Sequence, residues 1–201
     1  MNIYSIDGLK GIVNLINGKL RLPKAYQIDL IIDWLNQKHN TNIKKLPITR
    51  LAISNDAWLA GFIDADGYFG VTVKAIKGKS YFGCQFQLSQ RILDPKTGKS
   101  YGPVIKSIAE YFHVKVRIKK DKLRRYYVIE ASSTKSKKMI RAYLDKFSLL
   151  SSKYLDYKDW CVVDDLIMTK QHLIQEERVR QIKNTMNTSR TELNWDHLNL
   201  L

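Results

Sequence analysis

The stretch WLAGFIDADGYFGVTVKA constrains the fold more than any other part of the chain, because a helix must pass into a strand there without a loop. The run Trp58–Asp66 predicts a helix, and Gly67 is expected to end it, as glycine commonly does. Phe69, Val71 and Val73 then alternate with more polar neighbours, which predicts a strand that buries one face. A helix joined so closely to such a strand indicates a domain in which helices pack on a sheet.

The rest of the chain continues this alternation of helices and strands. The turn KGKS is followed by elements expected as a strand through Cys84, Phe86 and Leu88, a helix from Pro103, strands at residues 114–120 and 124–132, and a helix from about Tyr154 to Gln175. Helix N-caps are expected at Ser54 or Asn55 and at Ser133 or Thr134. Val114, Val116 and Ile118 are expected to point inward, whereas the facing of the fourth strand stays open. The order αββαββα predicts an α+β fold with helices on the apolar face of an antiparallel sheet.

Two further helical stripes precede this unit. They consist of Ile6, Leu9, Val13 and Ile16, and of Ile28, Ile31, Ile32 and Leu35. Asn17-Gly18 breaks the first stripe, and Pro23 precedes the second. We therefore divide the chain into a linker-like helical appendage, residues 1–53, and a main domain, residues 54–201.

The charge of the chain points to a polyanionic partner. Among 201 residues, 34 Lys and Arg stand against 19 Asp and Glu, a formal net charge of +15. Each cation placed near a phosphate releases a condensed counterion, so nucleic acid is the first candidate, with an anionic membrane surface or a ribosome as the alternatives. No apolar run approaches the ~20 residues that cross a bilayer, so an integral membrane protein is excluded.

Compartment is indicated by the cysteines and by the first residues. Cys84 and Cys161 form no CxxC pair, which argues against a zinc site and for a reducing compartment. The opening residues do not read as a signal or transit peptide. We expect a protein that is cytosolic or made inside the organelle that uses it.

The helix before Gly67 carries two features that point to chemistry. Ala57, Gly61 and Ala65 recur every four residues, and small residues there allow a partner helix to approach closely. Asp66 lies at the helix C-terminus, where the dipole makes a carboxylate unfavourable by about 0.3–1 kcal/mol. Two such helices would bring two carboxylates together, which requires a cation between them, and hard oxygen ligands suit Mg²⁺. Asp64 is the alternative ligand.

Residues 59–67 resemble the LAGLIDADG signature of homing endonucleases, with Phe62 as the one departure. The resemblance implies a saddle-shaped sheet over DNA and selects Asp66 as the metal ligand. It also implies that Gln90, at the end of FQLSQ, orders the catalytic water. Lys153, in LLSSKY, is implied to be the basic residue near the scissile phosphate.

The polar face of the sheet is the expected DNA surface, because cations outnumber acids on it. An ordinary solvated face is the alternative. Contacts to base edges and phosphates are expected from Thr72, Lys74, Lys77, Lys79, Gln85, Gln87, Arg117, Lys119 and Arg125. The loops KGKS and KKDKLRR would extend the contact along the duplex.

The resemblance extends to LINGKLRLPK and MNTSRTELNWDHL, which are similar to segments flanking the second motif of intron-encoded endonucleases of fungal mitochondria. Those proteins usually carry two motifs, whereas this chain has one. It is therefore expected to act as a homodimer or as the C-terminal half of a two-motif enzyme, encoded in a mitochondrion. The alternatives are an RNA-binding maturase of a group I intron and a non-catalytic RNA-binding structural subunit.

Overall fold

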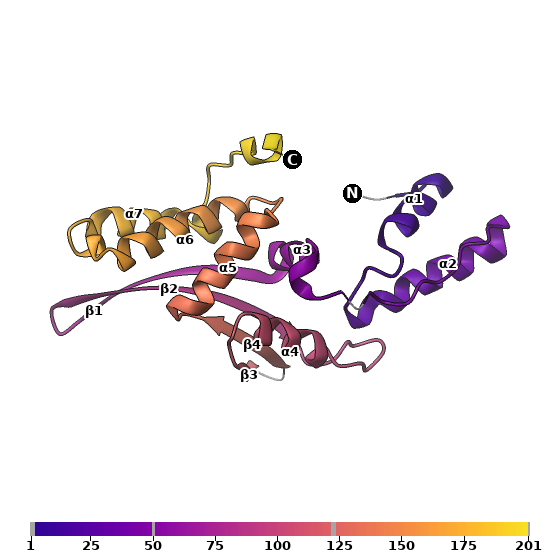
Figure 1. Ribbon diagram of the computed structural model, residues 1–201, viewed down its shortest axis with the longest axis horizontal. Helices are drawn as coiled ribbons and strands as arrows, with labels where there is room; N and C mark the ends of the chain where they lie inside the picture. The colour runs from indigo at the N-terminus through magenta and orange to yellow at the C-terminus, as the bar shows by residue number, and fades with distance from the viewer. Residues whose placement is uncertain (1–2, 50, 122–123, 201) are drawn as a thin grey trace.

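The computed structural model describes residues 3–49, 51–121 and 124–200. Position 50, next to the expected domain boundary, and positions 122–123 of the expected loop KKDKLRR lie outside the described residues. Figure 1 shows one curved sheet with helices packed over it and a separate pair of helices, α1 and α2, beside it. Within the described ranges no helix is both long and apolar enough to cross a membrane.

Four antiparallel strands form the sheet in the order β1-β2-β4-β3. They are β1 Gly67–Ile76, β2 Lys79–Arg91, β3 Val116–Asp121 and β4 Arg124–Ala131. The turn expected at KGKS is confirmed: Ile76 pairs with Lys79, and Lys77 and Gly78 between them adopt φ of 50° and 71°. Two consecutive left-handed residues give a hairpin turn whose twist matches that of the strands.

Helices cover one face of this sheet, so the expected α+β fold is confirmed. They are α3 Trp58–Asp66, α4 Gly102–Tyr111, α5 Thr134–Lys146, α6 Lys153–Met168 and α7 Glu176–Thr185. Phe69 of β1 is fully buried, and its ring centroid lies 5.3 Å from Phe86, 5.4 Å from Tyr157 and 5.6 Å from Trp160. Fully burying each such side chain contributes roughly 1.5–3 kcal/mol, so this cluster fixes α6 on the hairpin of β1 and β2. In Figure 1, α6 and α7 lie above these two strands, and α5 crosses them.

The inward facing expected for Val116 and Ile118 of the third strand is confirmed by register, since Val116 pairs with the buried Ile129, but neither residue is buried. Val116 is 36% exposed and Ile118 is 55% exposed, because β3 is an edge strand and the main core draws its strand residues from β1, β2 and β4. The facing of β4, open from sequence, follows from register: Ile129 pairs with both Leu88 and Val116, and it is buried.

Neither Ser54 nor Asn55 caps α3. Both belong to a short 3-10 turn, Ile53–Asn55, and α3 begins only at Trp58 with Ala57 as N-cap. The N–H groups of its first turn are satisfied by the Asp56 carboxylate, 3.2 Å from the Trp58 nitrogen, and by the hydroxyl of Tyr143. A tertiary contact from α5 therefore replaces the expected local cap. The cap expected for α5 itself is confirmed, since Ser133 Oγ accepts from the Ser136 nitrogen.

The long helix expected to reach Gln175 ends at Met168. Thr169 turns its hydroxyl onto the Asp165 carbonyl at 2.8 Å, and Lys170 adopts the left-handed φ of 59°, which stops a helix. The chain continues through 3-10 turns and α7, with the remaining turns at Gln171–Leu173, Asn187–Ser189 and Asp196–Leu200.

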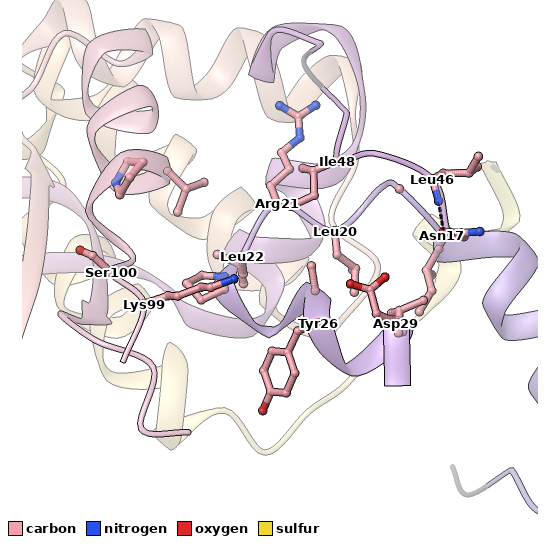
Figure 2. A pocket seen from close by; sticks show the side chains of 17 residues that line it. Asn17, Leu20, Arg21, Leu22, Tyr26, Asp29, Leu46, Ile48, Lys99 and Ser100 are labelled. Carbon is pink, nitrogen blue, oxygen red and sulfur yellow. Dashed lines mark hydrogen bonds between the residues drawn. The ribbon is translucent and has the colours of Figure 1, made fainter. Parts of the chain in front are cut away.

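The appendage has a hydrophobic core of its own. It contains α1 Ile6–Ile16, a 3-10 turn Pro23–Ala25 and α2 Tyr26–His39, whose buried residues are Val13, Ile28, Ile32 and Leu35. Asn17 holds the connector that follows, donating to the Lys44 carbonyl at 2.8 Å and accepting from the Leu46 nitrogen at 3.0 Å. A cavity of about 300 Å³ separates this segment from the loop before α4, with Lys99 and Ser100 on the loop side (Figure 2).

The two glycines of the helix-to-strand stretch are expected to respond oppositely to alanine. At Gly67 a Cβ would lie 2.7 Å from both Ile63 Cγ2 and the Ile63 carbonyl oxygen, so Gly67→Ala should destabilise the chain by about 1–3 kcal/mol. At Gly61 a Cβ would meet nothing within 4 Å, so Gly61→Ala should stabilise it by up to about 1 kcal/mol. Urea unfolding of both variants measures this, and equal effects would contradict it.

Candidate active site and nucleic-acid surface

Asp64, the first acid of α3, is engaged within the chain. Its Oδ2 accepts from the Leu150 nitrogen at 2.7 Å and from the Ser151 nitrogen at 3.2 Å, and its Oδ1 accepts from Ser151 Oγ at 2.6 Å. Hydrogen bonds to both oxygens leave this carboxylate poorly suited to a metal. Asp64 instead fixes the segment that leads into α6.

Asp66, the second acid, is exposed at the last position of α3. Its Oδ2 accepts from Gln90 Nε2 at 3.1 Å, while its Oδ1 has no hydrogen-bond partner among the described residues. Gln90 shares strand parity with the buried Leu88, so the end of β2 brings it to the helix side of the sheet. The other polar atom of the Gln90 amide, Oε1, accepts from the Arg91 backbone nitrogen at 2.8 Å, and this bond orients the side chain.

Lys153, the first residue of α6, lies at the same end of α3. Its Nζ donates to the Ile63 carbonyl at 3.1 Å, and the side chain is half-buried. Burial lowers the pKa of Lys153, and the negative charges of Asp64, Asp66 and Asp156 oppose that shift. The structure thus brings the three residues expected at the catalytic centre to one end of one helix.

A complete metal site is absent from the described part of the chain. No group of three or more His, Cys, Asp or Glu residues comes together there. Mg²⁺ prefers six oxygen ligands, of which proteins often supply only one or two carboxylates. Asp66, with one unengaged oxygen, fits the role of one protein ligand in such a site. A site shared between two carboxylates would take the second from another chain or segment.

The stripe of small residues on α3 faces away from the chain's own core. Ala57, Gly61 and Ala65 are exposed, and together with Asp66 and Gln90 they line an open groove of about 560 Å³. Intramolecular packing therefore gives no reason for a glycine in the middle of this helix.

Side chains alternate between the two faces of the sheet along each strand, and this alternation places most of the expected DNA contacts on one face. Opposite the helices lie Thr72, Lys74, Lys79, Gln85, Gln87, Arg117 and Lys119. This polar face also contains Glu130, which pairs in register with Gln87 and whose carboxylate lies 3.0 Å from Arg117. Exposed Tyr68 and Tyr81 belong to it as well. Sequence reasoning missed the two tyrosines, although their alternation with Phe69 and Phe82 was a signal for them.

Two of the expected contacts lie elsewhere. Lys77 is in the turn between β1 and β2. Arg125 pairs with Lys120. It lies on the same face of β4 as the buried Ile129, so it projects from the helix side of the sheet. The adjacent Arg124 has the parity of the polar face.

The chain is similar to proteins of one known family. The family model described as LAGLIDADG endonuclease matches residues 59–163. The chain is 28% identical to the intron-encoded DNA endonuclease aI3 of Saccharomyces cerevisiae over 98% of its own length and 56% of that protein. It is 34% identical to the probable intron-encoded DNA endonuclease aI1 of Mycosarcoma maydis, over 48% of its own length and 82% of that protein.

A solved structure shares the fold. The LAGLIDADG meganuclease I-AabMI, crystallised bound to uncleaved DNA, superposes with a TM-score of 0.69 over 92% of this chain and 76% of that one, at 21% identity. The chain therefore belongs to the LAGLIDADG endonuclease family. It spans about half the length of the yeast relative.

Lys153 should give the folded chain a characteristic pH dependence. Because its pKa is lowered on folding, the unfolded chain binds more protons between that pKa and the ordinary value of 10.5, and stability rises with pH across this window. Lys153→Met removes the charge, so its stability advantage over wild type should be largest below the window and shrink as pH rises through it. Urea unfolding of both proteins from pH 7 upwards checks this; a difference that does not vary with pH would refute it.

Proposed function

We propose that this chain is half of a site-specific DNA endonuclease that makes metal-dependent double-strand breaks at a long recognition site. The observation that carries the proposal is the meeting of exposed Asp66 with Gln90 and Lys153 at the end of α3. Membership of the LAGLIDADG endonuclease family supports it.

The second half would be another LAGLIDADG subunit. One chain supplies a single Asp66, whereas hydrolysis of two strands calls for two related centres. The exposed stripe of Ala57, Gly61 and Ala65 offers a surface on which a second helix can approach closely. A chain that spans 56% of its yeast relative fits either a homodimer or the C-terminal half of a two-motif protein.

Each residue of the centre has a distinct proposed part. Asp66 would hold Mg²⁺, which when bound activates water and stabilises the leaving oxygen of a phosphodiester. Gln90 would orient the attacking water by the amide that the Arg91 nitrogen already fixes. Lys153 would place a positive charge beside the phosphate, where charge develops in the transition state.

The polar face would bind the duplex. Gln85, Gln87 and Arg117 are suited to base edges in the major groove, and the lysines to phosphates. Arg117 is held by Glu130 in the free chain, so reading a base would require it to exchange this partner. The relatives are named as intron-encoded proteins of fungi, which supports an origin in a mitochondrial intron.

Asp66→Asn should abolish cleavage while DNA binding persists, because the amide removes the metal ligand and leaves the polar face intact. The loss should exceed the ~100-fold that changes around metal ligands typically cause. Cleavage of a DNA library with Mg²⁺, and again with EDTA, measures it beside a binding assay in Ca²⁺. Asp33→Asn, which alters an exposed acid of α2 paired with Lys45, is the control and should cut normally. Mg²⁺-dependent nicking by Asp66→Asn would refute the assignment.

Gly61→Leu should destroy assembly and cleavage together while the single chain still folds. A leucine would meet no neighbour near its Cβ within the chain but would separate two packed helices and their acids. Sedimentation with and without DNA, together with circular dichroism, distinguishes lost assembly from unfolding. Wild-type chain that stays monomeric on DNA, yet cuts both strands, would exclude this interface.

A further inference from the structure

Residues 186–197, here called the C-terminal strap, cross the first two turns of α6. Met186 is buried in the main core at the start of the strap. The Asn187 side chain then donates to the Phe69 carbonyl of β1 at 3.1 Å, and its backbone nitrogen donates to Asp156 Oδ1 at 2.9 Å. The strap thus connects the first strand to a residue one turn beyond Lys153.

Arg190 makes the second contact. Its Nε donates to Asp156 Oδ1 at 2.9 Å, and its Nη2 donates to Asp159 Oδ2. The side chains of Arg190 and Asp156 are only 13% and 10% exposed. Removing one partner would therefore leave a largely desolvated charge uncompensated, unlike the loss of a surface ion pair.

His197 makes the third contact by ring stacking. Its ring lies 4.2 Å from that of Tyr154 at an interplanar angle of 9°, and the residue is 7% exposed. Neither ring nitrogen has a hydrogen-bond partner within the described ranges. Packing against the residue that follows Lys153 therefore holds this histidine in place.

The first turn of α6 is held by contacts from residues outside the helix. Its N-cap, Ser152, makes no side-chain capping hydrogen bond. The Lys153 nitrogen donates instead to Ser151 Oγ at 3.1 Å, and that hydroxyl donates to Asp64. Asp64 of α3 thus holds this turn from one side and the strap holds it from the other.

We propose that the strap positions Lys153: Arg190 and His197 fix the first turns of α6 so that Lys153 Nζ stays at the Ile63 carbonyl, beside Asp66. The part of Lys153 in cleavage rests on the proposed function above, whereas its placement by the strap does not. The competing interpretation is that the strap only adds stability to α6 as a whole.

The side-chain resonance of Lys153 in [15N]lysine-labelled full chain reports its placement directly, with Lys153→Met for assignment and exposed Lys138 as reference. Arg190→Gln and His197→Ala should move this resonance toward that of Lys138. They should also lower kcat for DNA cleavage several-fold with little change in DNA affinity. His197→Ala removes ring contacts and no side-chain hydrogen bond among the described residues, so it provides a second variant if Arg190→Gln fails to fold.

Arg141→Gln is the matched control, because Arg141 pairs with Asp164 and Asp165 near the other end of α6. It should lower stability comparably and leave the Lys153 resonance in place. An unchanged resonance in a folded strap variant, or an equal shift in Arg141→Gln, would overturn the positioning. If the strap variants shift the resonance while even the wild-type chain cuts no DNA, the positioning would be supported and the proposed function would be contradicted.

Discussion

The contact between Gly67 and Ile63 is the constraint on which the rest of the site depends. No loop separates α3 from β1, so the chain turns within a space that has no room for a Cβ. This places Asp66 where the sheet begins. Because Gly67 pairs with Leu88 across the hairpin, the end of β2 returns to the same place and delivers Gln90. Local sterics at one glycine thereby determine where two side chains from distant sequence meet.

The rest of the domain holds α3 from one side only. Tyr143 of α5 donates to the Asp56 carbonyl at 2.8 Å and accepts from the Ala60 nitrogen at 3.1 Å. Burial raises the pKa of Tyr143 to about 12, so the hydroxyl keeps its proton for this bond. Asp64 ties the other end of α3 to the start of α6. On the opposite face, a Cβ at Gly61 would meet none of the described residues within 4 Å, so this face stays available.

The features that could be predicted from the sequence are those that depend on local patterns of residues. Alternation predicted the strand faces of β1 and β2, and the nonapeptide predicted a helix that ends at Asp66. Sequence could not show that β3 lies at an edge, which leaves Ile118 exposed, because strand order depends on tertiary pairing. The expected cap of α3 was wrong for the same reason, since the hydroxyl that accepts from the Ala60 nitrogen belongs to Tyr143, far along the chain. The strap was equally hidden, because nothing near Arg190 indicates its partners on α6.

The strap also sets an order in time. Protein synthesis runs from the N-terminus, and domains begin to fold as they emerge from the ribosome. Residues 186–197 are translated after α3, the sheet and α6, so Lys153 enters the nascent chain before Arg190 and His197 exist to hold its helix. A ribosome-bound intermediate would therefore contain Asp66, Gln90 and Lys153 and still lack the contacts that we propose hold Lys153 in place. Synthesis of the strap would then add these contacts, before a second subunit can complete the site.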